Sequence, residues 1–107
     1  MLIIHGYGGS AIWFYQMFKR LSKEFKVYAI DFIGMGASSR CKFDITDAKK
    51  SIEFIVKIIE LWRKAMQIKT MHILGHSLGG AFLGYYALYH PEHVTKAYFV
   101  SSAGFSQ

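Results

Sequence analysis

Two patterns of hydrophobic and polar positions follow one another along this chain, and together they predict strands separated by helices. Short apolar runs without alternation are typical of strands that a parallel sheet buries on both faces. These runs cover residues 1–4, 25–30, 70–74 and 94–100. Longer segments repeat apolar residues at spacings of three and four, as helices do. They cover about 11–24, 47–66 and 77–89. The order strand, helix, strand predicts an α/β fold, a parallel sheet with helices on both faces.

Capping residues set the expected helix boundaries. Ser10 is the expected N-cap of the first helix, and Thr46 or Asp47 that of the second. Pro91 ends the third helix, because proline cannot continue one.

The second predicted helix has two distinct faces. Its apolar positions are Ile52, Ile55, Ile59, Trp62 and Met66. Its charged positions form favourable i,i+4 pairs, namely Glu53 with Lys57 and Glu60 with Lys64. We therefore expect one buried face and one solvated face that includes Glu60.

Composition narrows the class of protein. The chain has 107 residues, 52% of them hydrophobic, and a net charge of +6. These values indicate one small globular domain, and no secretory signal or membrane-spanning run is present. Lys19, Arg20, Lys23 and Lys26 cluster near the end of the first helix, where its dipole favours cations. No nucleic-acid motif accompanies them, so we expect no nucleic-acid partner.

The segment Gly75-His76-Ser77-Leu78-Gly79 is the strongest chemical signal. It follows an apolar run and opens into a helix, as the nucleophile elbow of a serine hydrolase does. Such a turn exposes the serine Oγ above the sheet, and the helix N-terminus behind it favours developing negative charge. We predict Ser77 as the nucleophile; the alternative is an ordinary βα turn with an N-cap serine.

A second glycine-rich segment, His5-Gly6-Tyr7-Gly8-Gly9, follows the first predicted strand. Acyl transfer needs two backbone N–H groups that stabilise an oxyanion. We predict that the N–H groups of Tyr7 and Leu78 supply them, and that His5 braces the loop. If the first and third strands are neighbours, both glycine-rich loops meet in one crevice. A dinucleotide-binding loop is the alternative, but its G-x-G-x-x-G pattern is absent.

Other polar residues receive structural interpretations. Asp31 precedes the serine, whereas the acid of this fold follows it, so we expect Asp31 to bond turn N–H groups. Arg40 could hold a lipid phosphate, but a solvated loop arginine is the default. Cys41 lacks a Gly-rich elbow and is interpreted as a loop thiol.

No histidine stands where the catalytic base belongs, after a later strand. His76 should point away from the serine Oγ on a sharp elbow, and His72 lies within a strand. His90 and His93 flank Pro91, far from the catalytic edge of the sheet. We therefore expect a nucleophile and an oxyanion hole, without an acid–base pair.

Several segments together resemble the α/β-hydrolase superfamily, and more narrowly its branch of α/β-hydrolase domain proteins 4 and 5. They are His5-Gly6-Tyr7-Gly8, residues 34–40, 51–53 and 62–65, the elbow 71–80, His90-Pro91-Glu92-His93-Val94 and residues 103–105. The resemblance spans essentially the whole chain. It implies an eight-stranded fold of which residues 1–107 supply strands three to six, a partial α/β-hydrolase domain.

The resemblance implies a serine hydrolase of carboxylic esters, with lysophospholipids or other acyl lipids as substrates. It places the triad acid and histidine downstream, so we expect this chain alone to be inactive. An acyltransferase and a non-catalytic regulator of lipid metabolism are the alternatives. We expect no cofactor or metal, and a cytoplasmic location with peripheral contact to membranes, lipid droplets or mitochondria.

Overall fold

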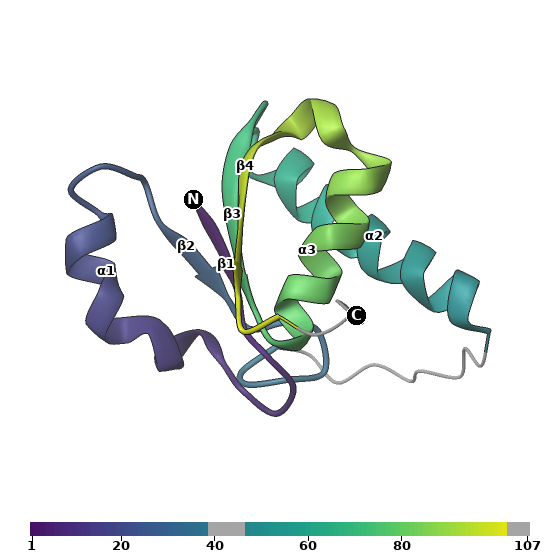
Figure 1. Ribbon diagram of the computed structural model, residues 1–107, viewed down its shortest axis with the longest axis horizontal. Helices are drawn as coiled ribbons and strands as arrows, with labels where there is room; N and C mark the ends of the chain where they lie inside the picture. The colour runs from purple at the N-terminus through teal and green to yellow at the C-terminus, as the bar shows by residue number, and fades with distance from the viewer. Residues whose placement is uncertain (39–46, 103–107) are drawn as a thin grey trace.

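The structure is a four-stranded parallel sheet with helices on both faces (Figure 1). The computed structural model describes residues 1–38 and 47–102. The strands are β1 (Leu2–Ile4), β2 (Tyr28–Ile30), β3 (Met71–His76) and β4 (Val94–Val100). Their order is β2-β1-β3-β4, and every pairing is parallel. The predicted fold class is confirmed. The first and third strands are neighbours, with Ile4 aligned to Gly75, so the condition for the two glycine-rich loops to meet is fulfilled.

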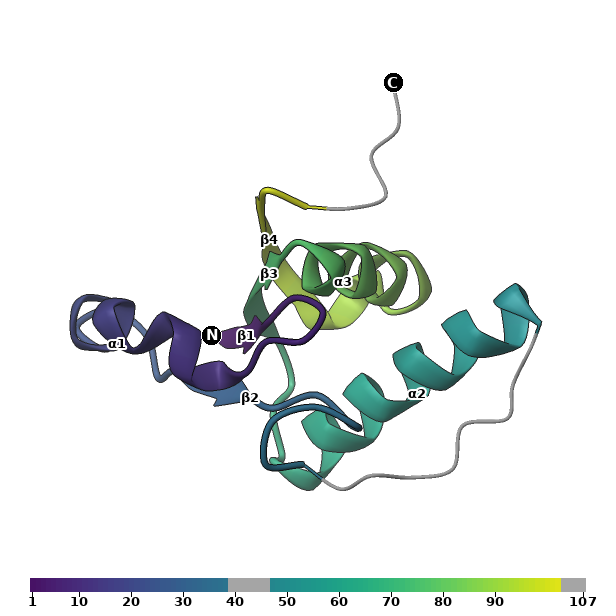
Figure 2. The same cartoon turned by 90° about the horizontal axis from the view of Figure 1, so that it is seen from below.

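The helices divide between the two faces of the sheet (Figure 2). They are η1 (Ala11–Phe14), α1 (Tyr15–Leu21), α2 (Ala48–Ala65), α3 (Leu78–Tyr89) and η2 (Pro91–His93), where η denotes a 3₁₀ helix. One face packs Ile3 and Leu74 against Phe14, and η1–α1 covers it. The other face packs the sheet against α2 and α3 around the fully buried Ile59, Leu83 and Tyr86. Among the described residues, no helix is both long and apolar enough to span a bilayer.

The first helix begins at Ala11 as predicted, but it ends earlier and its first turn is of another type. It begins as 3₁₀ helix η1 and its α-helical part ends at Leu21, so it is shorter than residues 11–24. Ser10 occupies the N-cap position as predicted, but its side chain makes no capping hydrogen bond. Instead, Asp31 Oδ1 accepts the Ala11 N–H at 2.7 Å. The cap therefore comes from a residue 20 positions along the chain.

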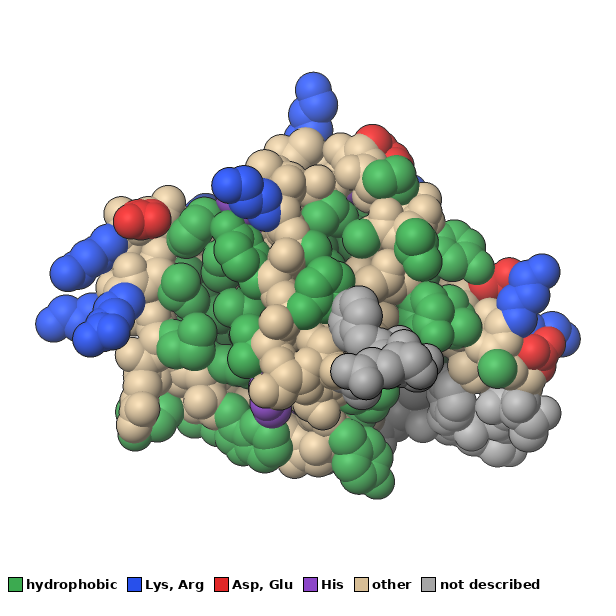
Figure 3. Space-filling model, viewed as in Figure 1, with side chains coloured by type: hydrophobic (Ala, Val, Ile, Leu, Met, Phe, Trp, Pro, Cys, Tyr) green, Lys and Arg blue, Asp and Glu red, His purple; other side chains and the backbone are tan. Residues whose placement is uncertain are grey.

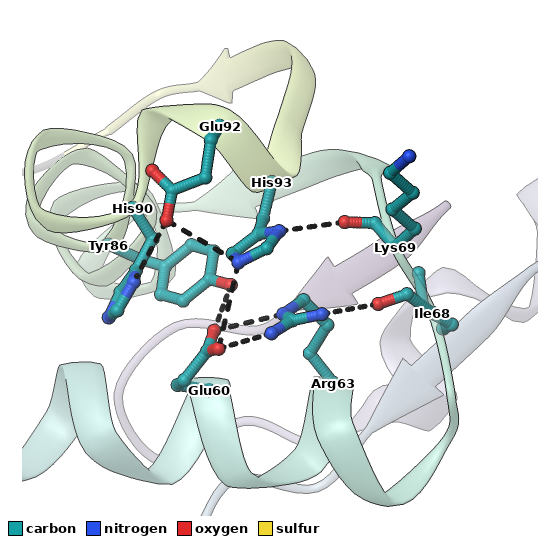
Figure 4. A network of polar contacts seen from close by, with 8 residues as sticks. All are labelled: Glu60, Arg63, Ile68, Lys69, Tyr86, His90, Glu92 and His93. Carbon is teal, nitrogen blue, oxygen red and sulfur yellow. Dashed lines mark hydrogen bonds and ion pairs between the residues drawn. The ribbon is translucent and has the colours of Figure 1, made fainter.

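Helix α2 confirms one local prediction and corrects another. Asp47 is its N-cap, and its side chain accepts the Lys49 N–H at 2.9 Å. Glu60, however, is buried rather than on the solvated face, at 8% exposure. Its carboxylate pairs with Arg63 and accepts the Tyr86 hydroxyl of α3 at 2.6 Å (Figure 4). The i,i+4 pattern failed here because the tertiary partner Tyr86 cannot be read from the sequence of α2.

Candidate active site

Ser77 lies at the sharp turn between the buried strand β3 and helix α3. Its backbone has φ 52° and ψ −118°, and residues other than glycine rarely adopt such a positive φ. Such strain persists only where the surroundings enforce it, and it is characteristic of the nucleophile elbow. The Ser77 N–H donates to the Val100 carbonyl of β4 at 3.1 Å, which fixes the turn to the neighbouring strand.

Gly79 lets α3 start close against the end of β1. A Cβ atom at this position would lie 2.6 Å from the His5 carbonyl oxygen, closer than real Cβ contacts allow. Gly75 meets a similar constraint, since its Cβ would lie 2.7 Å from Gly80 Cα. The glycines on both sides of Ser77 are therefore required by packing, and they set the position of the helix N-terminus behind the serine.

The loop after β1 passes directly beside Ser77. A Cβ atom on Gly6 would lie 3.0 Å from Ser77 Cβ, and the loop closes through the Gly9 N–H, which donates to the Gly6 carbonyl at 3.0 Å. Within the described residues, no acceptor is assigned to the N–H groups of Tyr7 and Leu78. Of the two predicted oxyanion donors, Tyr7 follows Gly6 on this loop and Leu78 is the first residue of α3. The Tyr7 side chain itself points outward and is 81% exposed.

His5 holds this loop to the connection that follows β2. The side chain is buried, and its Nε2 accepts the Phe32 N–H at 2.9 Å. Because Nε2 accepts, the ring proton is on Nδ1, which donates to the Gly6 carbonyl at 2.7 Å. Both nitrogens are thereby occupied in positioning the loop, and neither is available as a base.

His76 packs into an aromatic group rather than against the serine hydroxyl. Its ring lies edge-on to Trp13 and Phe14, with ring centroids 6.5 Å and 6.3 Å away. Its Nδ1 is buried without a hydrogen-bond partner in the described part of the chain. His72 lies within β3 beside Phe25, and no hydrogen bond in the described residues joins any histidine to the Ser77 hydroxyl.

Asp31 fastens two loops and does not approach Ser77 as a catalytic acid would. Its Oδ1 accepts the Ala11 N–H at 2.7 Å, and its Oδ2 accepts the Ala37 N–H at 2.9 Å. These backbone donors, Ala11 first, lower the pKa of the Asp31 carboxyl from its usual value. The structural role predicted for Asp31 is confirmed. Arg40 and Cys41 lie outside the described residues.

The sequence matches a family model described as the alpha/beta hydrolase fold over residues 1–106. It is 42% identical over 106 residues to a 1-acylglycerol-3-phosphate O-acyltransferase of Arabidopsis thaliana, covering 99% of this chain and 25% of that protein. It is 37% identical over 107 residues to 1-acylglycerol-3-phosphate O-acyltransferase ABHD5 of Rattus norvegicus, covering 100% of this chain and 30% of that protein. The chain thus spans between a quarter and a third of the length of these relatives.

Solved structures of similar shape include hydrolases. A 2-hydroxy-6-oxo-6-phenylhexa-2,4-dienoate hydrolase of a Rhodococcus species superposes with a TM-score of 0.88 at 26% identity, covering 99% of this chain and 39% of that one. A membrane phospholipase A described as a bacterial virulence factor superposes with a TM-score of 0.87 at 27% identity, covering 98% of this chain and 33% of that one. In both, the chain matches only part of a longer domain.

Proposed function

We propose that this chain, which belongs to the α/β-hydrolase fold family, carries the nucleophile of an enzyme that cleaves carboxylic esters of lipids. The observation that carries the proposal is the geometry at Ser77. The serine is held at φ 52° between a buried strand and a helix N-terminus, with a glycine-rich loop beside it. In a nucleophile elbow, such an arrangement exposes Oγ and provides backbone N–H groups for the negative charge that develops during acyl transfer, which supports the proposal.

In the proposed reaction, Ser77 Oγ attacks the acyl carbonyl carbon and its proton passes to a general base. The N–H groups of Tyr7 and Leu78 stabilise the oxyanion of the tetrahedral intermediate. The ester C–O bond then breaks, the alcohol leaves with a proton, and an acyl-enzyme remains on Ser77. Water attacks the acyl-enzyme, which releases the fatty acid and restores the serine hydroxyl.

The base of this reaction is proposed to come from outside the described residues. His5 is occupied by the Gly6 carbonyl and the Phe32 N–H, and His76 packs against Trp13 and Phe14. A triad needs a histidine within hydrogen-bond reach of Oγ and a carboxylate that orients it. Since the chain matches about a quarter of its Arabidopsis relative, the rest of the protein has ample length to supply both.

Two features support a lipid as the acyl donor. The relatives named above are acyltransferases of a glycerophospholipid precursor, and one structural neighbour is a phospholipase. The surface around η1–α1 also suits contact with lipid. Ile12, Trp13 and Tyr15 are each more than half exposed, and Lys and Arg side chains project at the α1 end of the molecule (Figure 3). Exposed aromatic and aliphatic side chains beside cations are typical of surfaces that meet lipid.

Acyl transfer is the second candidate, and the printed names of the relatives favour it. The same acyl-enzyme on Ser77 would form, but the hydroxyl of 1-acylglycerol-3-phosphate would replace water as the attacking group. Only the acceptor distinguishes the two reactions, so Ser77 and the oxyanion donors keep the same roles in both.

The experiment is substrate profiling of the whole protein that carries this chain, with and without an acceptor. Lysophospholipids and acyl-CoA serve as acyl donors, and 1-acylglycerol-3-phosphate as acceptor. Release of free fatty acid supports hydrolysis, and a diacyl product that needs the acceptor supports transfer. Either activity should fall by about 10⁴-fold in Ser77→Ala, because the acyl-enzyme cannot form.

The matched control is Ser51→Ala, which removes a hydroxyl of α2 that donates to the Asp47 carbonyl. It should retain full activity. If Ser77→Ala retains the turnover of the unchanged protein, the nucleophile assignment is wrong for both reactions. If the folded protein turns over none of these donors, a non-catalytic role is favoured instead.

A further inference from the structure

Four metal-ligand side chains converge at the end of the sheet opposite Ser77 (Figure 4). Strand β3 begins at Met71, which pairs with Val94, and ends beside Ser77, so the segment before Val94 lies at the far end. His90 terminates α3, and Glu92 and His93 lie on η2. Glu60 reaches the same point from α2. The cluster is therefore separate from the candidate active site.

The distances in this cluster are close to those of a metal site. Glu92 Oε1 lies 3.4 Å from His93 Nε2 and 3.6 Å from His90 Nδ1, and Glu60 Oε1 lies 3.9 Å from His93 Nε2. The ligand atoms of Glu60, His90 and His93 all lie within 4.8 Å of one another. Neighbouring ligands of a tetrahedral zinc ion are about 3.3 Å apart, given bonds of about 2.0–2.1 Å. Small rotations of the part-exposed His90 and Glu92 side chains would close the difference.

His93 is already oriented as a ligand. Its Nδ1 lies 2.8 Å from the Lys69 carbonyl oxygen, and a carbonyl can only accept, so Nδ1 carries the proton. In the neutral ring, Nε2 then presents its lone pair toward Glu60 and Glu92. Histidine ligands of metals are commonly fixed by this second hydrogen bond to a backbone carbonyl. The His90 ring stacks beside it, with ring centroids 6.1 Å apart.

The carboxylates supply the charge that a divalent cation needs. Arg63 donates to both carboxylate oxygens of Glu60, and the Tyr86 hydroxyl donates to one of them, which is the pairing expected of a buried carboxylate. Glu92 adds a second carboxylate next to both histidines. The two carboxylates and the Arg63 guanidinium together carry a net charge of −1. A divalent cation would therefore be attracted to the cluster, and the net charge with the ion bound would be +1. Two imidazoles with carboxylates suit Zn²⁺ better than Mg²⁺ or Ca²⁺, which prefer all-oxygen sites.

We propose that His90, His93 and Glu92, with Glu60 as the fourth ligand, bind a divalent transition-metal ion of the Zn²⁺ class. The ion would join α2 to the turn between α3 and β4, and thus act as a structural clamp rather than as a catalytic group. Arg63 and Tyr86 would keep their bonds to Glu60 and hold its carboxylate in place.

The test is calorimetric titration of the whole metal-free protein with Zn²⁺. His90→Gln and His93→Gln should each weaken binding by about tenfold or more, because each removes a ligand. His72→Gln is the matched control, since His72 lies on β3 beside Phe25 and Tyr98 and outside the cluster. It should bind Zn²⁺ as tightly as the unchanged protein. Binding retained in a folded His90→Gln/His93→Gln double variant would overturn the proposal.

A second measurement avoids any variant that fails to fold. Imidazole nitrogen resonances of the unchanged protein can be followed by NMR while Zn²⁺ is added. The proposal predicts that the signals of His90 and His93 shift at one equivalent while those of His5, His72 and His76 stay in place. Unmoved His90 and His93 signals, or shifts confined to the other histidines, would contradict it.

Discussion

Asp31 shows how one side chain positions the loops around Ser77 without taking part in chemistry. It joins the start of η1 to the turn after β2 by accepting two backbone N–H groups. Both bonds are to the ionised carboxylate, so the folded protein keeps the pKa of Asp31 below its usual value. The pKa of the unfolded chain is near 3.8, and the extra stability is therefore present above that pH. It is lost as the pH falls through the lowered value of the folded state.

Replacing this carboxylate should have a pH-dependent effect on stability. We expect Asp31→Asn to lower the free energy of unfolding at pH 7 by about 1 kcal/mol, because the side chain is partly exposed and its bonds are partly screened. Urea unfolding of the whole protein at pH 7 and near pH 3 measures this. The gap between the two proteins should shrink on acidification, as the unchanged Asp31 also loses its charge. A gap of the same size at both pH values would contradict the account.

Some residue roles could be predicted from the sequence and others could not. Ser77 and its glycines form a local motif, so the strained turn and its helix follow from neighbouring residues alone. Asp31 was predicted to bond turn N–H groups, but its cap on Ala11 depends on a contact 20 residues away. The role of Glu60 was missed for the same reason, since Tyr86 reaches it only in the folded protein. The spacing His90-Pro91-Glu92-His93 was the available signal for a metal cluster, and the buried Glu60 completes it.

At the scale of elements, the contact between α3 and the sheet decides where Ser77 is placed. The first turn of α3 packs against the end of β1 through Gly79, with no room for a side chain. Later in the same helix, Gly84 has space among the described residues, since a Cβ there would meet Phe99 Cε1 at 3.8 Å, an ordinary van der Waals distance. The packing around α3 therefore excludes a side chain at Gly79 but leaves room for one at Gly84.

Alanine at each of these glycines should change stability in opposite directions. Gly79→Ala should lower the free energy of unfolding by about 3 kcal/mol, because the methyl group collides with backbone atoms that cannot move freely. Gly84→Ala should raise it by about 0.5–1 kcal/mol, because alanine loses less backbone entropy in a helix. Thermal unfolding of both variants beside the unchanged protein is the measurement. Equal effects of the two substitutions on stability would contradict the close packing of α3 against β1 at Gly79.

At the scale of the whole molecule, both outer strands leave an edge of the sheet without a partner among the described residues. Strand β2 pairs only with β1, and β4 pairs only with β3. Near the end of β4, Phe99 and Val100 are each 42% exposed, and Leu88 on α3 is 78% exposed. Unpaired edges and exposed apolar side chains promote association between chains.

Residues 1–107 produced alone should therefore be poorly stable and prone to aggregate. Size-exclusion chromatography with light scattering, followed by thermal unfolding, measures both properties. We expect oligomers and a broad transition, because apolar surface and strand edges remain exposed. A monomer with one sharp cooperative transition would contradict this expectation.

The order of strands and helices was the feature of this protein that could be predicted best from its sequence. This order was predicted correctly, since buried parallel strands and amphipathic helices have distinct hydrophobic patterns. The order of the strands within the sheet was not predicted, because it depends on contacts between distant segments. Boundaries were less predictable where a segment is stabilised by distant contacts. Strand β2 begins at Tyr28 rather than Phe25, whose N–H donates to the Leu21 carbonyl at the end of α1.

The central claim is that Ser77 is an activated nucleophile in the whole protein. The most direct measurement is labelling of that protein with a fluorophosphonate probe, followed by identification of the modified residue by mass spectrometry. We expect one phosphonylated serine, Ser77, and loss of labelling in Ser77→Ala but not in Ser51→Ala. Labelling that persists in Ser77→Ala, or that maps to another serine, would contradict it.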